Sequence, residues 1–202
     1  MGTKNPRAVA EAGEAAGVYE ATVMELHGIL GRFFETRSGL INAVAEAIAA
    51  SVRAGGKVLV FGNGGSAAEA QHFAAELVNG MEHRDRPPIP AIALTTDTSL
   101  LTAIGNDRGF VLVFSRQVEA LGRPGDVAVA LTTSGTSPNV VEALKTARAK
   151  GLLTVGLTGE GGGEVAPLAD HLLDVPSRST PRVQEAHLFI LHILAEELED
   201  RV

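Results

Sequence analysis

Two patterns of apolar and polar positions divide the chain into an N-terminal helical part and a longer part in which strands and helices alternate. Apolar residues recur at helical spacing over residues 16–35 and 38–52, and two glycines follow. Such an amphipathic period predicts α-helix, and glycine is common just after a helix end. We therefore expect two helices within residues 14–55, preceded by a frayed segment, residues 1–13.

After residue 56 the period changes. Short apolar runs rich in β-branched residues alternate with longer amphipathic stretches. Runs of this kind are typical of strands that are buried on both faces of a parallel sheet. We expect strands at residues 57–61, 91–94, 126–131, 153–157 and 171–175, and helices between them, including 99–104 and 111–121, with a last helix from Pro181 to about Glu199.

Alternating strands and helices indicate an α/β three-layer sandwich with a five-stranded parallel sheet and right-handed crossovers. The sequence contains no internal repeat and no low-complexity linker. We therefore expect one domain, residues 1–202, with an α/β core at residues 56–200. The two N-terminal helices would either pack on this core or mediate assembly.

Composition excludes several kinds of chemistry. The chain has no cysteine, so it has no disulfide, no thiolate metal site and no thiol nucleophile. Its 24 acidic and 17 basic residues give a net charge of -7, which disfavours a broad nucleic-acid surface. No apolar run reaches the length of about 18 residues that a membrane span needs, and no signal-peptide h-region is visible. We expect a cytoplasmic protein that binds neither nucleic acid nor membranes.

A glycine-rich turn follows the first expected strand. Ligands of open parallel sheets bind beyond the carboxyl ends of the strands, where this chain has three loops of small polar residues, 62–66, 97–107 and 132–137. The first, Gly62-Asn63-Gly64-Gly65-Ser66, allows close backbone approach, and the next helix offers free N–H groups to an anion. The alternative is a tight turn capped by Ser66. The spacing matches neither a Walker A loop nor a G-x-G-x-x-G loop.

The loop at residues 132–137 carries five hydroxyl side chains in six residues, again between a strand and a helix. Hydroxyls and helix N–H groups together can hold a phosphate without a cationic side chain. An ordinary hydroxyl-rich helix cap is the alternative. Because five hydroxyls exceed what a cap requires, we favour a phosphate or sugar-phosphate ligand.

Two histidines and a glutamate could supply acid–base or metal chemistry. His72 and Glu76 are four residues apart on one helix face, where they could bind a metal, form an oriented acid–base pair or simply pair at the surface. In the last helix, His192 lies about 140° around the axis from His187, so these two do not share a face. Apolar neighbours favour burial of His192, as a core histidine or as a group that titrates near neutral pH.

Four motifs occur in order along the chain: residues 62–77 (GNGGSAAEAQHFAAEL), 105–107 (GND), 132–137 (TTSGTS) and 182–187 (RVQEAH) with His192 downstream. Together they resemble the bacterial phosphoheptose isomerases of the sugar isomerase (SIS) domain superfamily, whose fold is flavodoxin-like. The resemblance covers about residues 37–200. It implies an aldose–ketose isomerase that converts sedoheptulose 7-phosphate to D-glycero-D-manno-heptose 7-phosphate through an enediol.

The resemblance also implies roles for single residues. Glu76 corresponds to the catalytic base and His192 to its acid–base partner. The family's zinc ligands, which hold one ion per subunit, correspond to His72, Glu76, Gln184 and His192. The family forms homotetramers with active sites between subunits. Its substrate-contacting positions correspond to Asn63, Gly64, Gly65, Ser66, Glu76, Asn106, Asp107, Thr132, Thr133, Ser134, Ser137 and Gln184.

The spacing of two implied zinc ligands leaves their arrangement open. Gln184 and His192 are eight residues apart, about 12 Å along a helix axis. Bonds to zinc are about 2 Å long. One helix supplies both ligands only if their side chains converge. The alternative is that neighbouring subunits contribute.

The chain departs from the family pattern in two places. Thr132 and Thr136 stand where relatives often carry Ser and Asn, and both keep a hydroxyl. Many relatives also have an arginine shortly after the His72–Glu76 helix, where this chain reads Asn79-Gly80-Met81. If that arginine contacts the substrate, Arg84 or Arg86 would have to replace it.

Another class of function is open to the same fold. A non-enzymatic SIS protein acts by binding a protein partner such as a replication initiator, and it lacks the paired His and Glu and the late histidine. This chain keeps them, which favours the enzyme. Sugar-phosphate-sensing SIS modules are usually attached to a DNA-binding domain, for which 202 residues leave no room.

Overall fold

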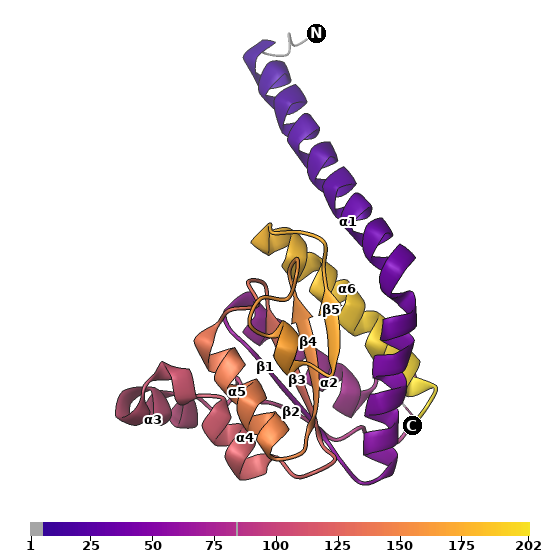
Figure 1. Ribbon diagram of the computed structural model, residues 1–202. Helices are drawn as coiled ribbons and strands as arrows, with labels where there is room; N and C mark the ends of the chain where they lie inside the picture. Colours follow the sequence, from indigo (N-terminus) through magenta and orange to yellow (C-terminus); the bar gives the residue numbers. More distant parts are fainter. Residues whose placement is uncertain (1–5, 84) are drawn as a thin grey trace.

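The computed structural model describes residues 6–83 and 85–202, and of residues 6–16 it describes the backbone alone. Its elements alternate between helices and strands, as the sequence predicts (Figure 1). They are α1 (Pro6–Arg53), β1 (Val58–Gly62), α2 (Gly65–Asn79), β2 (Ala91–Ala93), α3 (Thr98–Arg108), the 3-10 turn η1 (Phe110–Leu112), α4 (Ser115–Leu121), β3 (Val127–Thr132), α5 (Pro138–Ala149), β4 (Leu153–Thr158), the 3-10 turn η2 (Ala166–Leu168), β5 (His171–Asp174) and α6 (Thr180–Glu199).

A single helix, α1, stands where the sequence predicts two. The predicted break before Ser38 is wrong, because nothing there stops the backbone from continuing: the Thr36 hydroxyl donates to the carbonyl of Arg32, and no proline interrupts the turn. Residues 1–5 lie outside the described residues, whereas residues 6–13, predicted to be frayed, are helical. Figure 1 shows that the first half of α1 projects well beyond the rest of the molecule.

The five predicted strands form one sheet in the order β2-β1-β3-β4-β5. Every neighbouring pair is parallel, which confirms the predicted sheet. The chain moves from β1 outward to β2 and then crosses back to β3 on the other side of β1. The order therefore reverses between β1 and β3, and this switch point is where open α/β sheets bind ligands.

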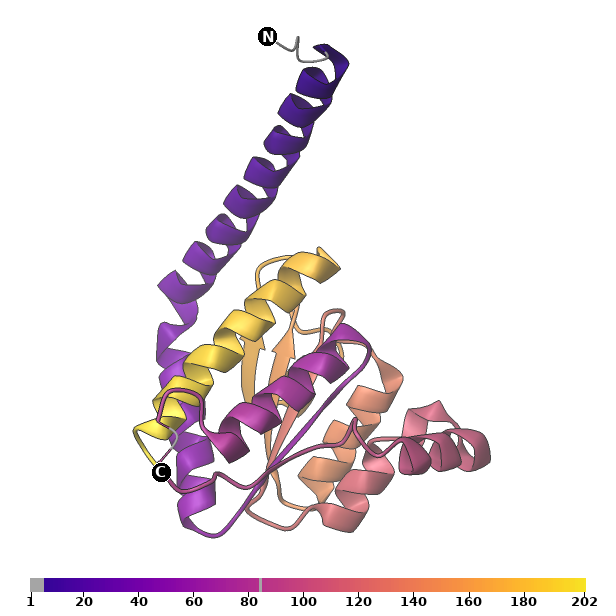
Figure 2. The same ribbon diagram turned by 180° about the vertical axis from the view of Figure 1, so that it is seen from behind.

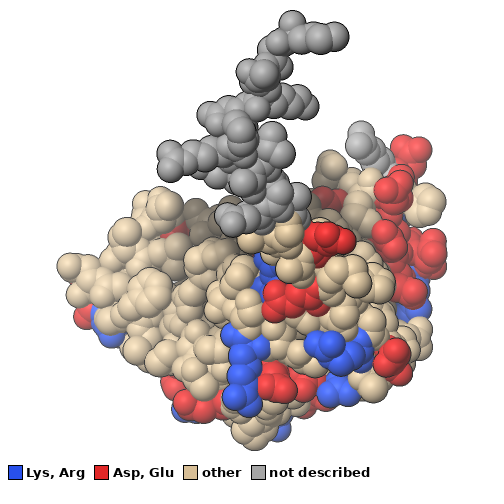
Figure 3. All heavy atoms as spheres, turned by 90° about the horizontal axis from the view of Figure 1, so that it is seen from above, with Lys and Arg blue, Asp and Glu red and all other residues tan. Residues whose placement is uncertain are grey.

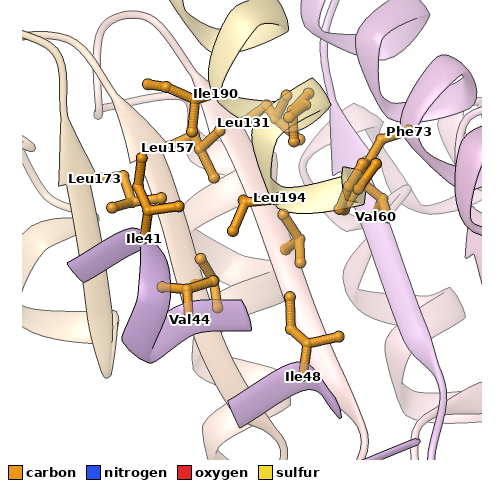
Figure 4. Close-up of a cluster of buried hydrophobic side chains, with 14 of the residues drawn as sticks. Ile41, Val44, Ile48, Val60, Phe73, Leu131, Leu157, Leu173, Ile190 and Leu194 are labelled. Atoms are coloured by element: carbon orange, nitrogen blue, oxygen red, sulfur yellow. The ribbon is translucent and has the colours of Figure 1, made fainter. Parts of the chain in front are cut away.

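Helices cover both faces of the sheet and complete the three layers. One hydrophobic cluster joins one face to α1, α2 and α6, and a second joins the other face to α3, α4 and α5. Figure 2 shows α2 and α6 side by side across the first face. Figure 4 shows Ile41, Val44 and Ile48 of α1 meeting strand residues such as Leu157 beside Leu194 of α6. None of the helices in the described part of the chain is long and apolar enough to cross a membrane.

One buried carboxylate ties the end of α6 to the segment after α2. The Glu199 side chain, 1% exposed, accepts hydrogen bonds from the backbone N–H groups of residues 81–83 at 2.6 to 3.1 Å. Nε of Arg86 lies 3.2 Å from Oε1 of Glu199. Burial alone would raise the pKa of Glu199, but the three N–H donors and the guanidinium outweigh it and lower the pKa to about 2.

We expect Glu199→Gln to lower the free energy of unfolding by about 2–4 kcal/mol at pH 7, because it leaves a buried guanidinium without its counter-charge. The folded-state pKa of about 2 lies below the ordinary value of 4.5. The carboxylate therefore stabilises the fold fully above pH 4.5, and this contribution is lost as the pH falls toward 2. Urea unfolding at pH 7 and pH 3 measures both effects, with a smaller gap between the two proteins at pH 3.

Glu197→Gln is the matched control. Glu197 lies on the same helix and pairs with Arg201, but its side chain is 43% exposed. Its replacement should cost less than about 1 kcal/mol. If Glu199→Gln costs no more than Glu197→Gln, the carboxylate does not have the stabilising role described here.

Candidate active site

A polar cavity of about 80 Å³ lies at the switch point, between the loops that follow β1 and β3. This volume exceeds the 10–15 Å³, roughly, that one water needs on the same measure, so a group larger than water can enter. All but one of its lining residues are polar, and the family resemblance implies a substrate contact for every polar one. The polar lining residues are Asn63, Ser66, Thr132, Thr133, Ser137 and Gln184, and the apolar one is Leu131.

Two helices begin at this cavity without a side-chain cap. Helix α2 begins at Gly65 and α5 at Pro138, and no side chain accepts a hydrogen bond from the first turn of either. The Ser137 hydroxyl instead lies 3.0 Å from the Thr132 hydroxyl. Ala67 and Val140 donate to the backbone carbonyls of Gly64 and Ser137, and Pro138 has no N–H. The N–H groups of Gly65, Ser66 and Asn139 have no acceptor among the described residues, so an anion can accept from them, and both helix dipoles favour one. Ser66 therefore does not cap α2, and Ser137 does not cap α5.

The hydroxyl loop is held by its backbone. Gly135 has a φ of 68°, and a Cβ at this position would overlap the carbonyl of Gly162. The Gly135 carbonyl also accepts the N–H of Val165 at 3.0 Å. The Ser134 hydroxyl accepts the N–H of Thr136 at 3.2 Å, and both side chains are exposed. These two residues lie at the rim and do not line the cavity.

The predicted acid–base residues come together where α2 packs on α6. Nε2 of His72 lies 2.7 Å from Nε2 of His192, and their rings meet edge to face. Nε2 of His72 also lies 3.7 Å from Oε1 of Glu76. In a hydrogen bond between two imidazoles one ring nitrogen donates and the other accepts. The three side chains can hold and transfer protons.

The expectation that His192 is buried is wrong, because the core histidine of α6 is His187. His192 is half-buried, whereas His187 is fully buried against β4, with Nε2 3.1 Å from the carbonyl oxygen of Thr158. Burial lowers the pKa of His187 to about 4, so it is neutral near pH 7. The two histidines face different neighbours, as their angular spacing predicts.

The structure separates other predicted site residues from this cluster. Gln184 lines the polar cavity and touches Gly65, eight residues along α6 from His192. Asn106 and Asp107 lie on the last turn of α3, which is helical to Arg108 where the sequence predicts a loop, and they bond each other at 2.7 Å. The residues that line the polar cavity do not include these two.

Arg86 has a structural role. Its guanidinium donates to the backbone carbonyl of Glu76 at 2.8 Å, to Glu199 and to the carbonyl of Pro87, and its side chain is only 6% exposed. It therefore holds the end of α2, and these contacts occupy its guanidinium. Arg84 lies outside the described residues.

Sequence reasoning missed one buried carboxyl beside the cluster. Glu69 lies on the same face of α2 as Gly65, His72 and Glu76, within about 60° around the axis. Its Oε2 has no hydrogen-bond partner among the described residues, and burial raises its pKa to about 7. Its spacing of three residues before His72 was the available signal.

None of the described residues that line the cavity is a lysine or an arginine. Figure 3, seen from above the view of Figure 1, shows uncharged side chains over its left part and charged side chains of both signs across its lower and right parts. An anion bound in the cavity would therefore depend on helix N–H groups and hydroxyls more than on lysine or arginine.

Comparison with known proteins agrees with this geometry. Residues 23–159 match the SIS domain family. The chain is 56% identical over 165 residues to the phosphoheptose isomerase of Nitratidesulfovibrio vulgaris, covering 82% of this chain and 79% of that protein. For that of Aquifex aeolicus the identity is 54% over 170 residues, covering 84% and 88%. The solved phosphoheptose isomerase GmhA from Neisseria gonorrhoeae matches with a TM-score of 0.86 and 43% identity, over 92% of this chain and 99% of that one.

We expect Gly65→Ala to weaken the binding of inorganic phosphate about fivefold or more, as measured by isothermal titration calorimetry. The added Cβ would lie 2.9 Å from Cδ of Gln184 and would push that side chain into the cavity. Gly39→Ala, at an open position on α1, is the control and should leave the affinity unchanged. Equal affinities in both variants would show that phosphate binds elsewhere.

Proposed function

This chain belongs to the phosphoheptose isomerases of the SIS domain family, and we propose that it converts sedoheptulose 7-phosphate to D-glycero-D-manno-heptose 7-phosphate. The observation that carries this proposal is the facing of His72 and His192 at 2.7 Å, with Glu76 beside them. A protein that acts only by binding a partner protein does not need two histidines and a glutamate close to a polar cavity that can hold an anion. The substrate is a phosphate ester, for which that cavity offers N–H and hydroxyl donors.

The distance along α2 between the cavity and His72 fits a seven-carbon substrate. Ser66 lines the cavity and His72 is six residues further along the helix, which is about 9 Å. An extended seven-carbon chain with its terminal phosphate spans about 10 Å, from C–C bonds of about 1.5 Å. A phosphate bound in the cavity would therefore place C1 and C2 near the histidines, and the remote anchor would orient the reacting carbons.

In the proposed reaction, protons move at C1, C2 and their oxygens. The Glu76 carboxylate removes a proton from C1 of the open-chain ketose while His192 gives a proton to the C2 carbonyl oxygen, which yields the enediol. Glu76 then gives its proton to C2, and His192 takes the proton of the C1 hydroxyl. This leaves the aldehyde at C1. Hydrogen bonding to His72 would orient the His192 ring during both transfers.

A zinc ion is compatible with the donors present. Two imidazole nitrogens and a carboxylate are a common zinc-binding set. Among residues 6–83 and 85–202, no three His, Asp or Glu side chains are arranged to hold a metal, and His72 and His192 are closer than the roughly 3.4 Å that separates two tetrahedral ligands. A small opening of this pair would admit the ion. Bound by His72, Glu76 and His192, with Gln184 if it turns toward them, zinc would stabilise the enediolate oxygens as a Lewis acid.

We also propose that the chain assembles as a homotetramer with active sites between subunits. Its α1 helix exposes Val18, Tyr19, Val23 and Met24, each at least 62% accessible, on the segment that projects beyond the body. Contiguous exposed apolar residues mark interaction surfaces. A neighbouring subunit could supply Asn106 and Asp107, which lie apart from the cavity here.

We expect Glu76→Gln to lower kcat for sedoheptulose 7-phosphate by at least about 10³, because the amide cannot accept the proton from C1. The melting temperature should change by only a few degrees. Glu142→Gln on α5 is the control, since this partly exposed carboxylate pairs only with Lys145. Detection of the aldoheptose product measures turnover, and near-normal turnover by Glu76→Gln would refute the assignment of the base.

Metal analysis tests the zinc proposal separately. We expect about one zinc per chain in the purified protein, and a chelator should remove the zinc, lower the melting temperature and abolish turnover. Added zinc should restore both properties, because a ligand that binds only the folded state stabilises it. Full activity in a protein shown to contain no metal would exclude zinc from the reaction.

A further inference from the structure

A pair of asparagines, with Asn139 buried and Asn63 half-buried, crosses the switch point. Nδ2 of Asn63 donates to Oδ1 of Asn139 at 2.9 Å, and Nδ2 of Asn139 donates to Oδ1 of Asn63 at 2.8 Å. Asn139 is 3% exposed and is the second residue of α5. The bonds are reciprocal, so each amide satisfies the other and both planes are held in register.

The loop before α2 has no other side chain with which to form such a contact. Between β1 and α2 it consists of Asn63 and Gly64, with Gly62 and Gly65 on either side, and Gly64 adopts a φ of 58° that favours glycine. A loop of this composition has many accessible conformations, which makes its ordering costly in entropy. Among the described residues, the amide pair provides the hydrogen bonds that join a side chain of this loop to the opposite side of the sheet.

Asn63 stands between two cavities. It lines the polar cavity and also a neighbouring, mainly apolar cavity of about 110 Å³ formed with Thr95, Leu101 and Phe110 among others. Each amide uses one N–H in the pair and keeps a second N–H free. The orientation of Asn63 therefore decides where this second donor points.

We propose that Asn139 is a positioning residue of the substrate site, which acts through Asn63 to hold the N-termini of α2 and α5 at a fixed separation around a phosphate. This inference rests on the proposed function only in naming a phosphate ester as the ligand. The two helices lie on opposite faces of the sheet, so no direct packing between them sets this distance. The amide pair sets it at the point where the anion binds.

Replacement of Asn139 by Leu, which is similar in size but makes no hydrogen bond, tests this role. We expect Asn139→Leu to weaken the binding of inorganic phosphate about fivefold, the effect of losing one hydrogen bond of about 1 kcal/mol. KM for sedoheptulose 7-phosphate should rise by a similar factor, with kcat within about twofold of the wild type, because the pair lies at the phosphate end of the site and not at His72 and His192.

Thr154→Val is the matched control. Thr154 is also fully buried, and its hydroxyl makes hydrogen bonds to Leu168 and Asp170 at the opposite end of the sheet. Its loss should lower the melting temperature by an amount similar to Asn139→Leu, without changing the affinity for phosphate. Equal losses of affinity in the two variants would show that Asn139 acts through general stability, which would overturn the proposal.

A double-mutant cycle asks whether Asn139 acts through Asn63. In an Asn63→Ala background, Asn139→Leu should weaken phosphate binding by less than about twofold, because the group that it positions is already absent. A full fivefold loss in that background would overturn the proposal, as would an unchanged affinity in the single variant Asn139→Leu.

Asn139→Asp separates affinity from stability. A carboxylate in the first turn of α5 favours the helix dipole and still accepts from Asn63, so the melting temperature should stay near that of the wild type. The same charge repels phosphate, and the affinity should fall more than tenfold. An unchanged phosphate affinity would show that residue 139 is not near the anion.

Phosphate binding is measured without the sugar, so the two proposals can fail separately. If the wild type does not isomerise sedoheptulose 7-phosphate but Asn139→Leu still weakens phosphate binding, the proposed function is wrong and the positioning role stands. If turnover is normal and Asn139→Leu binds phosphate as the wild type does, only the positioning role is wrong. A wild type that binds no phosphate overturns the positioning role as stated.

Discussion

The candidate active site depends on one topological constraint, the parallel pairing of β1 with β3 in the order β2-β1-β3. Because the chain leaves β1 toward β2 and later returns to β3, α2 covers one face of the sheet and α5 covers the other. The loops that follow β1 and β3 therefore lead to opposite faces at the carboxyl edge of the sheet. The uncapped N-termini of α2 and α5 border the space between these loops. An anion placed there completes hydrogen bonds that the fold leaves open.

The packing of α2 on α6 forms the other half of the site at a cost in stability. It brings His72 to 2.7 Å from His192, but it also buries Glu69, whose Oε2 has no partner within the described part of the chain. A buried polar atom without a hydrogen bond costs roughly 1–3 kcal/mol. Such local violations of good packing are expected at functional sites and are offset elsewhere in the fold, here in part by the Glu199 carboxylate and its four donors.

Period and glycine placement predicted the five strands and the parallel sheet that they form, because buried parallel strands and glycine-rich turns have strong local signals. They did not predict the order of the strands in the sheet. They did not predict that α1 is continuous, since a serine within a helix resembles a helix start. The pairing of His72 with Glu76 follows from helical spacing alone. That His72 meets His192 was implied by the family resemblance and not by spacing. The role of Arg86 and the Asn63–Asn139 pair could not be predicted, because each joins residues far apart in sequence through the packing of whole elements.

Helix α2 belongs to both halves of the site and therefore fixes the distance between them. Its first turn borders the anion cavity, and its third and fourth turns carry His72 and Glu76. A helix rises by about 1.5 Å per residue, so the distance between the two ends of the site hardly changes when side chains move. Both ends of α2 are also clamped, the first through the loop held by Asn139 and the last through the hydrogen bond from Arg86 to the carbonyl of Glu76. A protein with a net charge of -7 cannot attract an anionic sugar by its overall field. Selection must then come from this fixed distance together with local N–H and hydroxyl donors, which favour a phosphate ester whose reactive carbons lie about 9 Å from its phosphate.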